Sequence, residues 1–221
     1  MAYVLGFFAA DGSMLKNKRG AHFIEFTITD RIVLEQIQRV TNSTHRIARR
    51  ERGSNCKTGY RLQIGSKEWF SDLSQLGFTQ NKSSSLLFPK VPKRYFGDFV
   101  RGYFDGDGCV YFNRLKYSDR KNLRLVLLTL FTSGCRSFLE SLWHNLQAHG
   151  IRGGSLKNKT RGFELVFSHK DSIALHRLMY HTDKSPILYL PRKRKKLESA
   201  IRELQCGRMD YHTSRKFGEC N

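Results

Sequence analysis

The order of apolar and polar positions repeats along this chain. An apolar stretch at residues 4–12 closes on Asp-Gly, and a second such stretch stands 96 residues later, at 100–108. Each is followed by a segment in which apolar and polar residues alternate, 23–29 in the first copy and 123–129 in the second. Alternation of this kind is typical of a strand with one buried face. We therefore interpret the chain as two related units.

The elements that follow also correspond in order and spacing. Asp30 and Ser133 provide N-cap side chains for helices expected at 31–41 and 134–149. The other expected strands are 45–50, 59–64, 154–158 and 162–167, and the other expected helices are 67–76, 170–181 and 192–205.

This order of elements predicts an α+β fold made of two pseudo-symmetric αββαββα half-domains with antiparallel, saddle-shaped sheets. We expect the N-terminal half at 1–87, a linker with two prolines at 88–98, and the C-terminal half, with its last helix, at 99–221. Pseudo-twofold symmetry of this kind suits a duplex whose two strands run in opposite directions.

Small residues recur at helical spacing in the two apolar stretches. Gly6 and Ala10 are four residues apart, as are Gly102 and Gly106, so each pair lies on one face of its helix. Small residues at this spacing let two helices approach backbone to backbone. Because glycine costs a helix interior about 1 kcal/mol relative to alanine, the matched placement favours a helix pair over two unrelated core helices.

Such a pair would bring one acidic residue from each unit to the same place. Asp11 and Asp107 stand at the C-terminal ends of the two expected helices. A carboxylate is disfavoured at the negative end of a helix dipole, and two neighbouring carboxylates repel each other. The arrangement becomes favourable when divalent cations lie between them, and Mg²⁺ prefers carboxylate, water and phosphate oxygens.

Composition points to a polyanionic partner. Lys and Arg number 39 against 19 for Asp and Glu, which gives a formal net charge of +20. Residues 1–98 carry 16 basic and 8 acidic side chains and residues 99–221 carry 23 and 11, so both halves are cationic. Nucleic acid is the commonest polyanion bound by a folded domain with this charge. An anionic membrane surface is the second choice, although no apolar run is long enough to span a bilayer.

The segments V-L-G-F-F-A-A-D-G (4–12) and V-R-G-Y-F-D-G-D-G (100–108) resemble the paired motifs of the LAGLIDADG homing endonucleases in their single-chain form. The first copy departs from the family pattern at Ala9, where the family usually has its earlier acidic residue. The later aspartate, which binds metal in the family, is kept as Asp11 and Asp107. The resemblance spans essentially the whole chain.

The resemblance implies a site-specific endonuclease that hydrolyses both strands of a long asymmetric DNA target and leaves short 3′ overhangs. Asp11 and Asp107, with the carbonyls of Ala10 and Gly106, would hold Mg²⁺, which lowers the pKa of a bound water. Lys67 and Lys170 resemble the basic residues that the family places beside the scissile phosphate. We expect Mn²⁺ to substitute for Mg²⁺, and Ca²⁺ to support binding without cleavage.

The expected strands and their loops carry the basic residues that would contact DNA. Two-stranded ribbons fit the major groove, where arginine reads guanine, and other basic side chains contact phosphates. We assign this role to Lys16, Lys18, Arg19, Arg46, Arg49, Arg50, Arg52, Lys57, Arg61, Arg114, Lys116, Arg124, Arg152, Lys157, Lys159 and Arg161. The basic run 192–196 is interpreted as a phosphate-facing start of the last helix.

Two other functions remain open. The first alternative is a non-cleaving maturase that binds intron RNA on the same fold; the intact Asp11 and Asp107 favour the nuclease. The second is a DNA-binding regulator, which would need a helix-turn-helix region that we do not find. No splicing domain flanks the motifs, so we expect an intron-encoded protein over an intein.

The remaining expectations concern its compartment and assembly. Five cysteines without C-x-x-C spacing predict neither disulfides nor zinc. We expect a monomer in a reducing compartment, the cytoplasm or an organellar matrix, and no secretion.

Overall fold

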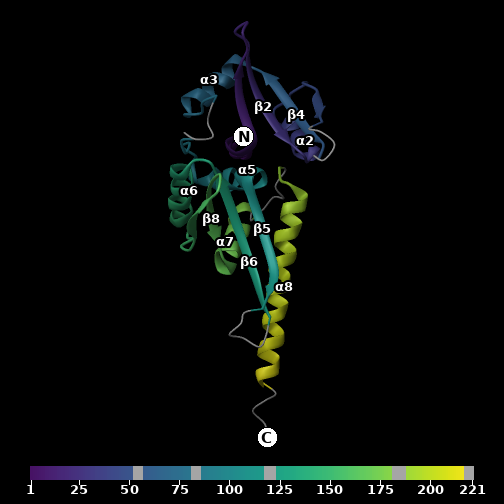
Figure 1. The fold of residues 1–221 in the computed structure, drawn as a ribbon, viewed down its shortest axis with the longest axis vertical. Helices are drawn as coiled ribbons and strands as arrows, with labels where there is room; N and C mark the ends of the chain where they lie inside the picture. Colours follow the sequence, from purple (N-terminus) through teal and green to yellow (C-terminus); the bar gives the residue numbers. More distant parts are fainter. Residues whose placement is uncertain (52–56, 81–85, 117–122, 181–187, 217–221) are drawn as a thin grey trace.

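The computed structural model describes the backbone of residues 1–51, 57–80, 86–116, 123–180 and 188–216, with side chains up to residue 206. It has the expected α+β architecture, with two four-stranded antiparallel sheets and their covering helices. Figure 1 shows one half above the other, with α8 running down along the second half towards the C-terminus. None of the helices in these ranges is long and apolar enough to cross a membrane.

Each half has the same order of elements. The first contains α1 (Ala2–Asp11), β1 (Gly12–Lys16), β2 (His22–Ile28), α2 (Arg31–Val40), β3 (Ile47–Arg50), β4 (Gly59–Gly65) and α3 (Lys67–Gln75). A short 3₁₀ turn, η1 (Lys93–Tyr95), leads into the second half. The second contains α5 (Phe96–Asp107), β5 (Gly108–Leu115), β6 (Arg124–Ser133), α6 (Arg136–Ala148), β7 (Ser155–Lys159), β8 (Gly162–Phe167), α7 (His169–Tyr180) and α8 (Pro191–Lys216).

The two sheets have equivalent topology, β1-β2-β4-β3 and β5-β6-β8-β7. In the first sheet Gly12 pairs with Phe26, and Phe26 pairs with Leu62. In the second, Gly108 pairs with Phe131, and Phe131 pairs with Leu165. The first strand residue after each motif helix therefore has equivalent pairing partners in the two sheets.

One face of each sheet forms the core. Ile24, Phe26 and Leu62 are fully buried in the first sheet, on the side of α2 and α3. In the second sheet Phe131 and Leu165, the counterparts of Phe26 and Leu62, are fully buried as well. Because strand side chains alternate, the neighbouring residues point to the opposite face. We call that opposite face, the one turned away from α2 and α3 or from α6 and α7, the open face of each sheet.

The structure differs from the sequence-based expectations at helix ends. Asp30 precedes α2 but its side chain does not cap the helix, because it binds Arg192 instead. Residue 135, not Ser133, is the N-cap of α6, although the Ser133 hydroxyl accepts a hydrogen bond from the Cys135 amide. Helix α5 begins at Phe96, inside the expected linker, and α8 extends to Lys216, well past the expected end.

Candidate active site and nucleic-acid interface

The two motif helices, α1 and α5, touch backbone to backbone. A Cβ atom added at Gly6 would overlap the carbonyl oxygen of Phe99, and one added at Gly102 would overlap the carbonyl oxygen of Tyr3. Phe99 and Tyr3 are themselves 96 residues apart, so the two contacts are copies of each other. The small residues thus lie at the crossing of a pseudo-symmetric helix pair.

The same crossing brings the two motif ends together. A Cβ atom added at Gly106 would overlap the Cβ of Ala10 and lie 3.2 Å from Oδ2 of Asp11. The Asp11 carboxylate therefore lies against the residue that precedes Asp107. Burial, and next the charge of Asp107, raise the pKa of the Tyr103 hydroxyl, and Asp11 contributes in the same direction. Both carboxylates are partly exposed to solvent.

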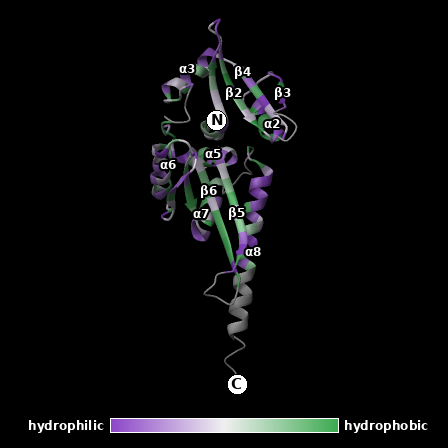
Figure 2. Ribbon diagram, viewed as in Figure 1, coloured by the Kyte–Doolittle hydropathy of each residue, from purple (hydrophilic) through white to green (hydrophobic). Residues whose placement is uncertain are grey.

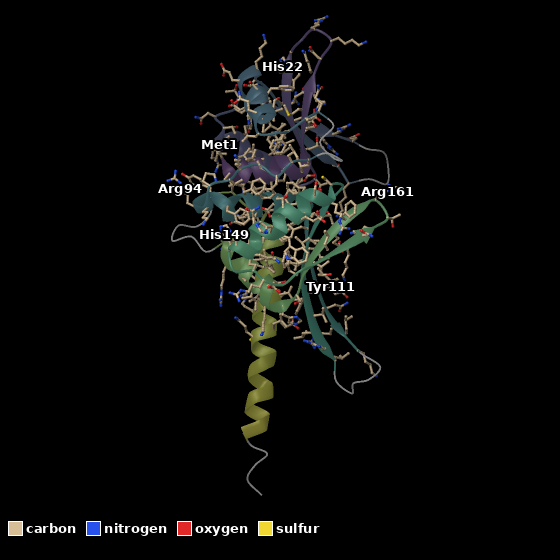
Figure 3. All side chains as sticks on the ribbon, turned by 90° about the vertical axis from the view of Figure 1, so that its left-hand side faces the viewer. Met1, His22, Arg94, Tyr111, His149 and Arg161 are labelled. Atoms are coloured by element: carbon tan, nitrogen blue, oxygen red, sulfur yellow. The ribbon has the colours of Figure 1, made fainter. Side chains whose placement is uncertain are left out.

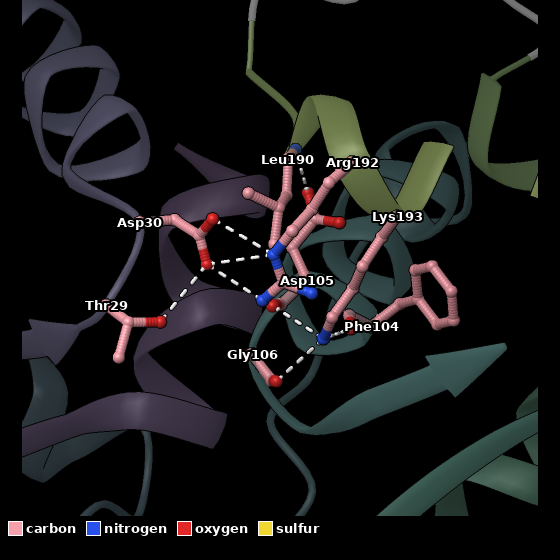
Figure 4. Close-up of polar contacts among 8 residues, drawn as sticks. All are labelled: Thr29, Asp30, Phe104, Asp105, Gly106, Leu190, Arg192 and Lys193. Carbon is pink, nitrogen blue, oxygen red and sulfur yellow. Dashed lines mark hydrogen bonds and ion pairs between the residues drawn. The ribbon is translucent and has the colours of Figure 1, made fainter. Parts of the chain in front are cut away.

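A buried lysine binds the end of α5 (Figure 4). The ammonium of Lys193, in the first turn of α8, donates to the carbonyls of Phe104, Asp105 and Gly106 at 2.8, 2.8 and 2.9 Å. Burial lowers its pKa to about 8, while the charges of Asp105 and of both motif aspartates oppose the shift. A cation at a helix C-terminus is favoured by the helix dipole and satisfies carbonyls that have no partner within the helix.

Asp105, the earlier acidic residue of the second motif, links α5 by hydrogen bonds to α1 and to the segment before α8. Its Oδ2 accepts hydrogen bonds from the Tyr3 hydroxyl at 2.8 Å and from the Leu190 amide at 2.7 Å. Burial raises the pKa of this carboxyl to about 6, against the lowering effect of those two hydrogen bonds. Within the described residues its other oxygen, Oδ1, has no hydrogen-bond partner.

Next to this cluster, α8 also binds the first half. Arg192 forms a bidentate contact with Asp30, with nitrogen–oxygen distances of 2.8 to 3.0 Å. The Tyr189 amide donates to the side-chain oxygen of Gln36 at 3.0 Å. The hydrogen bond from Arg192 is the main reason why the pKa of Asp30 is lowered. These contacts hold the start of α8 across the boundary between the halves.

The donor set at the seam suits a hard divalent cation in part. Two carboxylates, Asp11 and Asp107, and two carbonyls, Ala10 and Gly106, are oxygen donors of the kind that Mg²⁺ takes. No group of three or more His, Cys, Asp or Glu side chains exists in the described ranges that could hold a metal by itself. A metal here would therefore need water or phosphate oxygens as well, and the Gly106 carbonyl already accepts a hydrogen bond from Lys193.

The two lysines predicted to be catalytic, Lys67 and Lys170, lie away from the two motif aspartates. Gly12, which follows Asp11, pairs with Phe26, and Phe26 pairs with Leu62. From Leu62, β4 runs on to Gly65, about 10 Å at 3.3 Å per residue, before α3 begins at Lys67. The amide before it, Ser66, binds the carbonyl of His22, at the far end of β2. Lys170 has the same place in the second half, where its neighbour His169 contacts the carbonyl of Leu125. The geometry therefore separates both lysines from the aspartates.

Strand register divides the predicted DNA-binding residues between the two faces. On the open faces lie Arg50, Arg61, Arg124, Lys157 and Lys159. Arg114 belongs to the opposite face, where it binds Glu203 of α8 at 2.8 Å, and Lys16 and Arg49 share the register of the core face at exposed ends. The remaining exposed ones lie in turns or strand ends, namely Lys18, Arg19, Arg46, Lys57, Lys116, Arg152 and Arg161. Arg52 lies outside the described residues.

The open faces differ in chemistry. The first carries Ser13, Glu25, Thr27, Arg61 and Gln63, and the Gln63 amide donates to Glu25 at 3.2 Å. On the second, β5 and β6 contribute apolar side chains, and β6, β7 and β8 contribute the polar Thr132, Lys159 and Glu164. The apolar ones are Cys109, Tyr111, Val126, Leu128 and Leu130. Figure 2 shows β5 and β6 as largely hydrophobic strands, and Figure 3 shows Tyr111 and Arg161 on the same side of the second half.

The interpretation of the run 192–196 as phosphate-facing is wrong for its first three residues. Arg192 binds Asp30, Lys193 is buried against α5, and Arg194 binds Glu198 at 2.8 Å. A signal was present, because Lys193 precedes Leu197, Ala200 and Leu204 at helical spacing and so shares their buried face. The run was instead assigned to DNA phosphates because of its high positive charge.

Sequence comparisons relate the first motif unit to a known domain family. Residues 1–75 match the family model of the LAGLIDADG-like domain. Reverse gyrase of Methanocaldococcus jannaschii is 33% identical over 98 residues, which are 44% of this chain and 6% of that protein. The RNA polymerase subunit Rpo1C of the same organism is 25% identical over 178 residues, 79% of this chain and 18% of that protein. The chain thus spans a small part of these curated relatives.

Structure comparisons cover both halves. A double mutant of I-SmaMI superimposes with a TM-score of 0.64 at 13% identity, over 97% of this chain and 94% of the other. The LAGLIDADG meganuclease I-AabMI bound to uncleaved DNA gives 0.59 at 19% identity, over 96% and 91%. The homing endonuclease I-WcaI bound to its DNA recognition sequence gives 0.59 at 16%, over 89% and 84%.

The paired motif helices and the two sheets thus define the fold of the single-chain LAGLIDADG homing endonucleases. Within it, residues 1–75 of this chain match the model of the LAGLIDADG-like domain, and the second unit has the same order of elements as the first. The resemblance carried by the two motifs is confirmed.

Proposed function

We propose that this protein is a site-specific homing endonuclease that hydrolyses both strands of a long, asymmetric DNA target with Mg²⁺ and leaves short 3′ overhangs. One observation carries the proposal: Asp11 lies against Gly106, so that the aspartates of two separate motifs meet at the end of one symmetric helix pair. The similar structures I-AabMI and I-WcaI, both bound to DNA, support the same class of substrate.

The pseudo-symmetry of the site suits two antiparallel strands. Asp11 and Asp107 approach the seam from opposite halves, so each would serve one scissile phosphate. A divalent ion held by these carboxylates would supply positive charge at the phosphate and lower the pKa of the attacking water. Of the chain's own groups, Thr132 fixes the end of α5 by donating to the Asp107 carbonyl at 3.0 Å. Lys67 and Lys170 have no part in this proposal.

The open faces would hold the DNA on either side of the seam. Arg61 and Lys159 lie on these faces, and their ion pairs with Glu25 and Glu164 leave half of the lysine side chain and two fifths of the arginine exposed. Basic side chains here would contact phosphates and base edges, and binding would weaken steeply with salt. Because the two faces differ in sequence, the target would be asymmetric.

An intron RNA maturase on the same fold is the second candidate. A protein that only binds RNA has no need for two carboxylates at the negative ends of two helices, where they repel each other. Asp11 and Asp107 therefore favour the nuclease. Cleavage of DNA in the absence of any RNA substrate separates the two functions.

Selection from a randomised double-stranded DNA library tests the proposal. The full chain with Mg²⁺ should release ends that share one long asymmetric sequence, and Mn²⁺ should replace Mg²⁺. With Ca²⁺ the same sequence should be retained by the protein and left uncut. Enrichment of no sequence under either condition, together with tight binding of a structured intron RNA, would favour the maturase.

A further inference from the structure

The two open faces differ in the row of side chains one step beyond the first strand residue after each motif helix. In the first sheet Glu25 pairs with Ser13 on one side and with Gln63 on the other, and the Gln63 amide donates to Glu25 at 3.2 Å. We call these three residues the polar row. Each of them carries a group that can form hydrogen bonds with a ligand on this face.

The equivalent row of the second sheet is apolar. Leu130 pairs with Cys109 on one side and with Val166 on the other. We call Cys109, Leu130 and Val166 the apolar row. The two rows correspond, because each lies one residue beyond the equivalent pairs that follow the two motif helices.

The next row outward does not show this contrast. It is apolar on both faces, where Leu15 pairs with Phe23 and Tyr111 pairs with Leu128. A ligand that covers both open faces would therefore meet similar groups in the two outer rows. In the inner rows it would meet hydrogen-bonding groups on one side and apolar groups on the other.

The side chains of the apolar row lie outside the core of the second half. They are on the open face, turned away from α6 and α7. Cys109 is exposed and Leu130 is partly exposed. Both line an open hollow together with Asp107 and Lys159. Neighbouring apolar side chains that stay exposed in a folded domain mark a place where a partner binds.

The charges around the apolar row favour DNA as that partner. Arg124, Lys157 and Lys159 lie on the same face. The major groove of DNA has phosphates along its edges and one apolar group among its base edges, the C5-methyl group of thymine. A two-stranded ribbon fits into this groove, and Figure 2 shows β5 and β6 as largely hydrophobic strands. Apolar strands flanked by basic side chains thus match a groove that carries methyl groups.

We propose that the apolar row recognises C5-methyl groups of pyrimidines in one half-site of the DNA target, whereas the polar row reads the other half-site by hydrogen bonds. Base pairs at equal distances from the centre of the target are then recognised by different chemistry. Thymine supplies the methyl group in ordinary DNA, and C5-methylcytosine carries the same group. This inference rests on the proposed nuclease function and names what one half of the target must carry.

Changing one methyl group of the DNA at a time tests it. In the target from the library selection, each thymine is replaced singly by uracil and each cytosine by C5-methylcytosine, and dissociation constants are measured in Ca²⁺. At thymines near the centre of one half-site, loss of the methyl group should weaken binding about fourfold, the effect of burying one group of this size. At the equally distant base pairs of the other half-site, removing or adding the methyl group should leave the dissociation constant unchanged.

Two variants connect this response to the protein. Leu130→Ala removes the central side chain of the apolar row, so thymine and uracil should bind it equally well at the responding positions. Gln63→Ala is the matched control, because it shortens a side chain of the polar row and should leave the preference for thymine over uracil intact. If Leu130→Ala does not fold, Cys109→Ser changes its cross-strand neighbour with little change in volume and should reduce the preference in the same way.

The outcomes separate this inference from the proposed function. Equal methyl responses at matched positions of the two half-sites, or no response in either, would overturn the inference and leave the nuclease intact. A response that persists in full in Leu130→Ala, or in Cys109→Ser in its place, would overturn the assignment to the apolar row. A wild-type protein that selects and cuts no duplex sequence would instead contradict the proposed function, and this inference with it.

Discussion

The two motif helices share a backbone and differ in side chains. Gly6 and Gly102 make equivalent contacts with Phe99 and Tyr3, at positions 96 residues apart. The ends of the helices are not equivalent, because α1 carries the buried apolar residue Ala9 where α5 carries Asp105 with its hydrogen bonds. The backbone symmetry is therefore imposed by packing. At the end of α5, Asp105 accepts from the Leu190 amide, and Lys193 donates to the carbonyls of the last turn.

The largest expected effect comes from filling the helix crossing. Gly6→Ala and Gly102→Ala each place a methyl group on a backbone carbonyl, which cannot move without separating the helices. We expect each to lower the free energy of unfolding by about 3 kcal/mol or more, as overpacking does. Chemical denaturation of both variants checks this. Because the contacts are copies, the two values should agree, and tolerance of only one variant would contradict the symmetry.

Introducing the missing acid into the first helix should also be costly. Ala9→Asp would bury a carboxylate whose symmetry-related partner is Phe99, which cannot donate a hydrogen bond. We expect a loss of about 3 kcal/mol, the cost of an unpaired buried charge. Adding Phe99→Tyr to Ala9→Asp should recover part of it, because it rebuilds the pair that Tyr3 and Asp105 form. A double-mutant cycle by thermal unfolding measures the coupling; its absence would show that the two ends are not related in this way.

The open faces should read DNA differently. On the first, Gln63 and Arg61 can hydrogen-bond base edges, whereas Leu128 and Leu130 on the second can contact the methyl group of thymine. In selected targets, Gln63→Ala should relax base preference in one half-site by about 1–3 kcal/mol per contact. Leu130→Ala should weaken a thymine preference in the other. Changes that spread over both half-sites in either variant would contradict this division.

The smallest expected effect is at the contact between Asp30 and Arg192. The pKa of Asp30 is lowered in the folded protein, so its stabilising contribution is present above its ordinary pKa and is lost as pH falls below about 4. Arg192 is more than half exposed, so the contribution is about 1 kcal/mol or less. The melting temperature of Asp30→Asn should therefore lie slightly below that of the wild type at pH 6, and this difference should be smaller at pH 3. An unchanged difference at both pH values would contradict the assignment.

Much of this molecule could be predicted from its sequence because the same information occurs twice. The repeat located the strands to within one or two residues in most cases, and the spacing of Gly6, Gly102 and the aspartates predicted the helix seam. The catalytic assignment of Lys67 rested on matched position alone, and register along the sheet cannot be inferred from that. The intron-encoded origin and the compartment stay predictions.

The contacts that the sequence did not predict are those that single charged side chains make across the molecule. Lys193, Asp105 and Asp30 meet partners from distant segments, and hydrogen bonds between distant segments have no spacing signature. Arg114 was assigned to DNA by its charge, and only the pairing of β5 with β6 reveals that it points to α8. In each case the position of a charge, not its presence, decides what it does.

The central claim is that the carboxylates of Asp11 and Asp107 act together on DNA. Measuring cleavage in Mg²⁺ and binding in Ca²⁺ for Asp11→Asn and Asp107→Asn tests it most directly, since the amide keeps the shape and removes the charge. We predict that double-strand cleavage falls by at least about 100-fold in each variant while the dissociation constant stays within about threefold. Cleavage of both strands at the wild-type rate by either variant would contradict the account.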